Sequence, residues 1–137
     1  MKAASLVFEQ AILFAFGVVI FISCLAAFNN YQSYFNSVGV IDQLTEVSEF
    51  IGSNVIKLSE RSEEESSIKV QLPKKIAGES YVVELTQNGL NVTMPSTNSY
   101  KSSGLFGLNQ TFSLSGRVVS DHGNMIIIRS GNQIIIK

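Results

Sequence analysis

The chain has 137 residues, of which 45% are apolar and 15% are charged, and its formal net charge is −1. This balance argues against a disordered chain and against a protein that coats nucleic acid, because those classes need low hydrophobicity or a strong net charge. One cysteine cannot form a disulfide within the monomer, and one cysteine with one histidine leaves no zinc or iron–sulfur ligand set. The mean hydropathy of +0.24 indicates that apolar residues are concentrated somewhere in the chain.

They are concentrated near the N-terminus, where residues 11–28 form an 18-residue run without a charged or amide side chain. A helix rises about 1.5 Å per residue, so the run covers roughly 27 Å, close to the bilayer hydrocarbon thickness of about 30 Å. A cleaved secretory signal fits less well, because its apolar core is usually about 7–15 residues long and follows a more basic region. Lys2 precedes the run and the next basic residue is Lys57, which predicts a cytoplasmic N-terminus and an external remainder.

After residue 28 the apolar residues recur every three or four positions up to residue 58, which is typical of one helix face. We therefore expect one helix over residues 5–60, in which residues 5–28 form a membrane or filament-core segment and residues 29–60 are amphipathic. Gly39 and Gly52 each weaken this helix by about 1 kcal/mol relative to alanine and could bend it. The serine- and glutamate-rich residues 59–67 are expected to end the helix and form a solvated connection. They lack the spaced oxygen ligands and the bend glycine of a calcium loop.

From Ile68 onward the apolar residues alternate with period two, which predicts strands over residues 68–137. Alternating runs on both sides of Asn88-Gly89 predict a hairpin with a type I′ turn. Residues 95–107 are expected to form a surface loop, residues 112–118 a strand with a bulge at Gly116, and residues 121–124 a turn. Residues 125–128 and 134–136 predict a last hairpin that is apolar on both faces. The amphipathic half of the helix can cover one face, and the other needs a second layer or a neighbouring subunit.

The predicted fold class is α+β, with a long N-terminal hydrophobic-then-amphipathic helix followed by a small antiparallel β-sheet domain. Few residues in it suggest chemistry. His122 is expected to be an exposed turn residue, and Cys24 a small apolar residue within the membrane-length run. No phosphate-binding glycine pattern occurs in the sequence, and no nucleophile and base can be paired. We expect no enzymatic activity, no metal site and no cofactor.

Two triplets, Asn91-Val92-Thr93 and Asn109-Gln110-Thr111, match the N-glycosylation sequon. Both lie on the side of the membrane assigned as external. Asn91 falls on the polar face of its strand and Asn109 lies in or beside a loop, so both positions could carry a sugar without displacing core side chains.

Glu9 is unusual because it stands at the edge of the apolar run. At the level of the lipid headgroups a carboxylate is tolerated. In a packed, lipid-free core it needs a partner, such as the free α-amino group of a neighbouring chain.

Residues 2–9, Lys-Ala-Ala-Ser-Leu-Val-Phe-Glu, together with the apolar run that follows, resemble the class III signal of type IV pilin-like proteins. In that family a membrane prepilin peptidase removes a short basic leader, and a glutamate stands at the fifth position of the mature chain. The resemblance implies cleavage between Ala4 and Ser5, with residues 1–4 as the leader and Glu9 as the assembly glutamate. Bacterial prepilins usually have glycine before the cut and phenylalanine after it, so the match is better to archaeal pilins and archaellins. Residues 73–85 are similar to the first sheet region of archaeal pilin-like subunits.

The resemblance implies a membrane-inserted precursor that an assembly platform incorporates into an extracellular surface filament, for adhesion or motility, without a nucleic-acid partner. Apolar half-helices of many copies would bundle in the shaft, and β domains, often glycosylated, would face outward. The alternative is a membrane-anchored minor pilin, or an archaellum accessory or stator protein, with an extracellular β domain. A secreted or anchored hydrolase or a solute-binding domain is a third interpretation, and the lack of a catalytic constellation counts against it.

Overall fold

The computed structural model describes residues 2–137, and the side chains from Ser5 onward. The chain divides into two compact units, the first ending at Val38 and the second comprising Gly39–Lys137. Helix α1 (Lys2–Ser59) provides the whole described part of the first unit and also enters the second. It ends within a residue of the predicted boundary and continues through both Gly39 and Gly52, so neither glycine breaks it.

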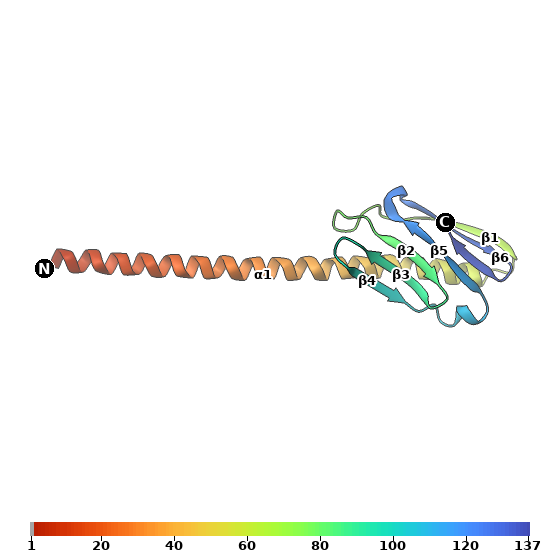
Figure 1. The fold of residues 1–137 in the computed structure, drawn as a ribbon, viewed down its shortest axis with the longest axis horizontal. Helices are drawn as coiled ribbons and strands as arrows, with labels where there is room; N and C mark the ends of the chain where they lie inside the picture. Colours follow the sequence, from red (N-terminus) through yellow and green to blue (C-terminus); the bar gives the residue numbers. More distant parts are fainter. Residues whose placement is uncertain (1) are drawn as a thin grey trace. The chain divides into compact units, whose positions relative to one another are not determined.

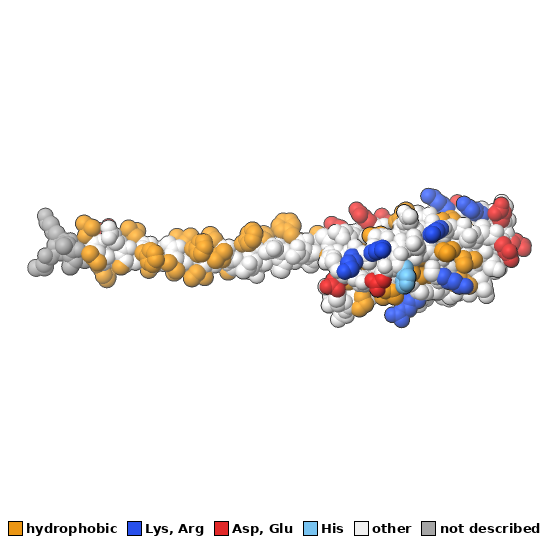
Figure 2. Space-filling model, turned by 90° about the horizontal axis from the view of Figure 1, so that it is seen from above, with side chains coloured by type: hydrophobic (Ala, Val, Ile, Leu, Met, Phe, Trp, Pro, Cys, Tyr) orange, Lys and Arg blue, Asp and Glu red, His pale blue; other side chains and the backbone are white. Residues whose placement is uncertain are grey.

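The first unit is a helix whose large apolar side chains are exposed. Phe8 is 69% exposed and Phe14 is 75% exposed, and every other residue from Ser5 to Val38 is exposed as well. Figure 2 shows hydrophobic side chains along this segment, whereas most Lys, Arg, Asp and Glu side chains lie on the second unit. By length and composition α1 can cross a membrane.

The second unit contains one seven-stranded sheet with the strand order β1-β6-β7-β5-β2-β3-β4 (Figure 1). Its strands are β1 (Glu65–Gln71), β2 (Val82–Thr86), β3 (Gly89–Met94), β4 (Ser99–Ser103), β5 (Ser113–Val119), β6 (Asn124–Ser130) and β7 (Gln133–Ile136). Neighbouring strands are antiparallel except β5 and β7, which run parallel. The α+β fold class is therefore confirmed, with one parallel pair in a mostly antiparallel sheet.

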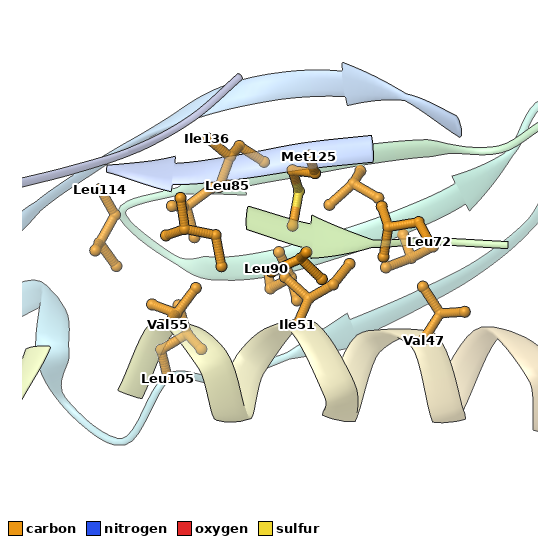
Figure 3. Packing of buried hydrophobic residues seen from close by; sticks show 14 of the residues in the cluster. Val47, Ile51, Val55, Leu72, Leu85, Leu90, Leu105, Leu114, Met125 and Ile136 are labelled. Atoms are coloured by element: carbon orange, nitrogen blue, oxygen red, sulfur yellow. The ribbon is translucent and has the colours of Figure 1, made fainter. Parts of the chain in front are cut away.

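The core of this unit lies between one face of the sheet and the C-terminal part of α1, as Figure 3 shows for Val47, Ile51 and Val55. The buried apolar residues of the helix follow the three- and four-residue spacing that places side chains on one helix face: Leu44, Val47, Ile51, Val55 and Leu58. Leu90, Met125 and Ile136 are buried core residues contributed by the sheet. This packing confirms the prediction that the amphipathic half covers one sheet face for the helix from Leu44 to Leu58, whereas residues 29–38 of that half are exposed in the first unit.

The predicted β2–β3 hairpin is confirmed, but its turn differs from the prediction. Thr86 pairs with Gly89, so Gln87 and Asn88 are the turn residues, and neither has positive φ. The Asn88 backbone N–H donates to Thr86 Oγ1 at 3.3 Å, and that hydroxyl donates to the Gly89 carbonyl oxygen at 3.2 Å. Because Thr86 stabilises the turn in this way, positive φ is needed at Gly89 alone, and the type I′ prediction was wrong.

Three further predictions need correction. Residues 95–107 are not one loop, because β4 lies within them and pairs with β3. β1 begins at Glu65, so the end of the solvated connection is already a strand. Gly116 forms no bulge, since it pairs in register with Leu85 and Ile136. Because Gly116 has no Cβ, the Ile136 backbone can lie where a Cβ would stand, and the φ of 133° is a second reason for glycine at this position.

The last hairpin, β6–β7, is confirmed and is apolar on both faces. Ile127 and Ile134 are buried in the core, while Ile126, on the opposite face of the sheet, is 40% exposed. The exposed face carries no second layer within residues 2–137.

Candidate functional site

The N-terminal residues singled out by the sequence lie in the first unit. Ser5 and Glu9 are both exposed on α1, and the side chain of Ala4 lies outside the described residues. Cys24 is exposed on the same helix and is a free thiol. The helix thus presents one carboxylate at the end of an apolar surface that the described side chains, from Ser5 onward, leave exposed.

His122 lies in the short helix η2 (Ser120–His122), directly before Gly123, and is exposed as expected. The hydrogen bonds at this turn come from its neighbour Ser120. The Ser120 hydroxyl donates to the Lys74 carbonyl oxygen at 2.7 Å and accepts from the Tyr81 backbone N–H at 3.0 Å. Ser80 donates to the Asp121 carboxylate. These contacts fasten the β1–β2 connection to the sheet and bring no base to a nucleophile.

Tyr81 is fully buried, and its hydroxyl donates to the Pro73 carbonyl oxygen at 2.7 Å. Burial raises the pKa of Tyr81 from 10.0 to about 12, because desolvation disfavours the phenolate. A neutral, hydrogen-bonded phenol in the core serves packing, and it holds residues 73–81 as a folded loop. No group of three His, Cys, Asp or Glu side chains that could hold a metal ion occurs in residues 2–137.

Arg129 is a structural residue that the sequence analysis did not single out. Its Nη1 donates to the carbonyl oxygen of Ser59 at 3.0 Å and to the carbonyl oxygen of Arg61. Its Nε donates to the carbonyl oxygen of Gly131 at 3.3 Å. Its guanidinium carbon lies 5.0 Å from the centre of the Phe112 ring. A cation at the C-terminal end of a helix satisfies free carbonyls and complements the helix dipole. Arg129 therefore ties the end of α1 to the sheet.

The two sequons have different surroundings. Asn91 lies on β3, which is paired on both sides, opposite Glu84 on β2 and Ser102 on β4, and it is half-buried. Asn109 lies in the short helix η1 (Leu108–Gln110) between β4 and β5, and both it and Thr111 are exposed. Asn109 is thus the more accessible acceptor, a difference that the alternation of the strand residues alone did not reveal.

Comparisons with known proteins add no identification. No family model, no curated protein and no solved structure matches the chain. The resemblance of residues 2–9 to class III signals therefore stays a prediction, and the functional argument depends on the chain's own surfaces.

Proposed function

We propose that this chain is the structural subunit of an archaeal type IV pilus-like surface filament, and that it polymerises through its N-terminal apolar helix. The observation that carries the proposal is the exposure of the whole apolar segment from Ser5 to Val38. Fully burying a large apolar side chain contributes about 1.5–3 kcal/mol, so a helix that exposes so many of them is not stable in water. Lipid or copies of the same helix must cover it.

The precursor can reside in a membrane before assembly, because α1 is long and apolar enough to cross a bilayer. Moving the helix from lipid into a helix bundle gains little from the hydrophobic effect, since lipid tails are as apolar as leucine. Packing and polar pairing then have to drive assembly. Glu9 is the polar group that fits this role, because in a dry bundle its carboxylate requires a positive partner.

The geometry of such pairing favours an open polymer. A contact between Glu9 of one copy and the N-terminus of the next joins two different surfaces, so it is heterologous. A heterologous contact that does not close into a ring produces a helical filament. In this proposal Ser5 is the first mature residue and supplies the α-amino group, and the β domain is carried on the outside of the shaft.

The test is Glu9→Gln in cells that assemble the filament, with Glu46→Gln as the matched control. Glu46 is an exposed carboxylate on the same helix, within the second unit. Breaking a buried ion pair costs about 3–5 kcal/mol, so Glu9→Gln is expected to lower filament yield at least about tenfold while membrane insertion stays unchanged. Glu46→Gln is expected to leave the yield unchanged. Equal yields from both variants would contradict the role of Glu9.

The alternative is a membrane-anchored accessory protein with the same fold. The two functions differ in processing and stoichiometry. A chain that keeps Met1 and stays in the membrane fraction without filaments would support the anchored protein and contradict polymerisation.

A further inference from the structure

One end of the β domain carries two grooves among its connections, and the polar side chains that line them are uncharged. Three connections meet there: the β2–β3 turn, the segment that contains η1, and the β6–β7 turn. Two adjoining grooves with volumes of about 500 and 140 Å³ lie among them, and they share Gln87 and Asn109 as lining residues. We call these two grooves together the turn-end surface.

The lining of the larger groove is dominated by amides. They come from all three connections and from the first residue of β7: Gln87, Asn109, Gln110, Asn132 and Gln133. The hydroxyls of Thr111 and Ser113 complete the polar lining, and Gln87 Nε2 donates to Ser113 Oγ at 3.2 Å. None of the residues that line either groove carries a charge.

Phe106 adds an exposed aromatic ring to the smaller groove. It is 89% exposed, while its neighbour Leu105 is buried in the core. The backbone of Phe106 has a φ of 47°, a left-handed conformation that is costly for a residue with a Cβ. The fold therefore holds a large ring out in solvent beside the amides by means of an unfavourable backbone, which is the kind of outlier that accompanies binding sites.

These features select a class of ligand. An amide offers a donor and an acceptor side by side, which matches the hydroxyl groups of a sugar, each of which is both a donor and an acceptor. Phosphates, nucleic acids and acidic sugars are bound most strongly by Arg and Lys side chains, and no Arg or Lys lines either groove. A peptide would bind along a strand edge or in an apolar pocket, whereas the larger groove is lined mainly by the amide side chains of connections between strands. We propose that the turn-end surface binds a neutral saccharide.

Such a saccharide can come from two sources with the same chemistry. One is a glycan of another surface, which would make the β domain a binding tip. The other is a glycan on Asn109 itself, whose first sugars would lie in the grooves that Asn109 lines. Its attachment forms a bond between Asn109 Nδ2 and the anomeric carbon of a lipid-linked oligosaccharide. The bond from that carbon to the lipid phosphate breaks, and the amide proton leaves with the phosphate.

For the first source, the full chain made in a host without N-glycosylation is presented in detergent micelles to immobilised neutral, sialylated and sulfated oligosaccharides. Asn132→Ala, Gln110→Ala and Phe106→Ala are compared with Gln71→Ala, an exposed amide on β1. Each groove variant is expected to weaken binding of neutral oligosaccharides about fivefold, as the loss of one hydrogen bond or ring contact implies, and Gln71→Ala is expected to change nothing. Circular dichroism of each variant establishes that it is folded.

For the second source, intact-mass analysis of the chain from its own cells is compared with that of Thr111→Ala, which removes the sequon and keeps Asn109. A hexose-containing mass increment that is present in the unaltered chain and absent from Thr111→Ala would show that the glycan is attached to Asn109. Carbon-13 relaxation of the proximal sugars is expected to show them immobilised, and Asn132→Ala is expected to mobilise them.

Either source supports the proposal. It is overturned if neutral oligosaccharides do not bind and no immobilised glycan is present on Asn109. It is equally overturned if only acidic oligosaccharides bind, or if the groove variants bind as the unaltered chain does. The measurements use micelle-embedded or purified subunits and do not require polymerisation. Failure of the filament proposal would therefore leave this one standing, and the reverse also holds.

Discussion

Ile51→Ala tests whether the second half of α1 belongs to the core of the β domain. Ile51 is fully buried against the sheet. The substitution removes three methyl or methylene groups, worth about 0.8 kcal/mol each, or about 2.4 kcal/mol in transfer free energy. The cavity left behind raises the expected cost to about 3–4 kcal/mol, within the range measured for such truncations in other cores. A domain of this size is stable by about 5–15 kcal/mol, so the variant should fold but lose much of its stability.

The assay is amide hydrogen exchange in β2 and β3 of the full chain in detergent micelles. A loss of 3–4 kcal/mol corresponds to protection factors lower by roughly 150- to 900-fold for amides that exchange through global unfolding. Phe50→Ala is the matched control, because Phe50 is the adjacent helix residue and is 49% exposed. We expect it to cost less than about 1 kcal/mol. Equal protection in the two variants would show that the helix does not stabilise the sheet, and would refute the reasoning.

Three further predictions concern stability, measured by urea or thermal unfolding of the full chain in micelles. The pKa of Tyr81 is raised to about 12, so the unfolded state loses its proton first. The contribution of this shift to the free energy of unfolding is therefore fully present below about pH 10 and falls by about 1.4 kcal/mol per pH unit up to pH 12. Tyr81→Phe should remove this pH dependence. Gly116→Ala should cost more than about 2 kcal/mol, because a Cβ there meets the Ile136 backbone, whereas Gly131→Ala, at positive φ in open space, should cost about 1 kcal/mol. Equal costs would contradict the steric argument. Arg129→Met should cost about 1.5–3 kcal/mol by releasing the carbonyls at the end of α1, and no loss would show that this cap is unnecessary.

The parts of the fold that the sequence predicts are those encoded by local periodicity. The three- and four-residue spacing predicts the helix and its buried face, and the two-residue alternation around Asn88-Gly89 predicts the β2–β3 hairpin. In the hairpin, and in the helix from Leu44 onward, the residues that carry the pattern pack into the core. Tyr31, Phe35 and Ile41 continue the same helical spacing toward the N-terminus but are exposed, so the spacing alone does not show where burial begins. The amphipathic half of the helix was expected to cover a sheet face for the same reason.

The elements that were missed depend on contacts between distant residues. β4 (Ser99–Ser103) is an edge strand with little apolar alternation, because it pairs on one side and buries few side chains. The parallel pairing of β5 with β7 places β7 between β5 and β6, an order that no local pattern encodes. Arg129 lies in an apolar strand, and its role depends on the end of a helix 68–70 residues earlier in the chain.

The candidate sites also differ in whether local sequence or contacts between distant residues create them. The exposed apolar helix and Glu9 can be recognised from composition, since an unbroken 18-residue apolar run is a local property. The turn-end surface could not be predicted, because its amides come from three turns that are separated in sequence and that only the sheet topology brings together. The sequon at Asn109 was the one signal in the sequence that pointed to this surface.

The central claim is that the apolar helix is held first by lipid and finally by identical helices. Electron microscopy of sheared cell-surface material, combined with mass spectrometry of the subunit, tests it most directly. The account predicts abundant filaments built from this chain, with Ser5 as the first residue. A water-soluble monomer that retains the whole helix, or surface filaments whose subunits lack it, would contradict the account.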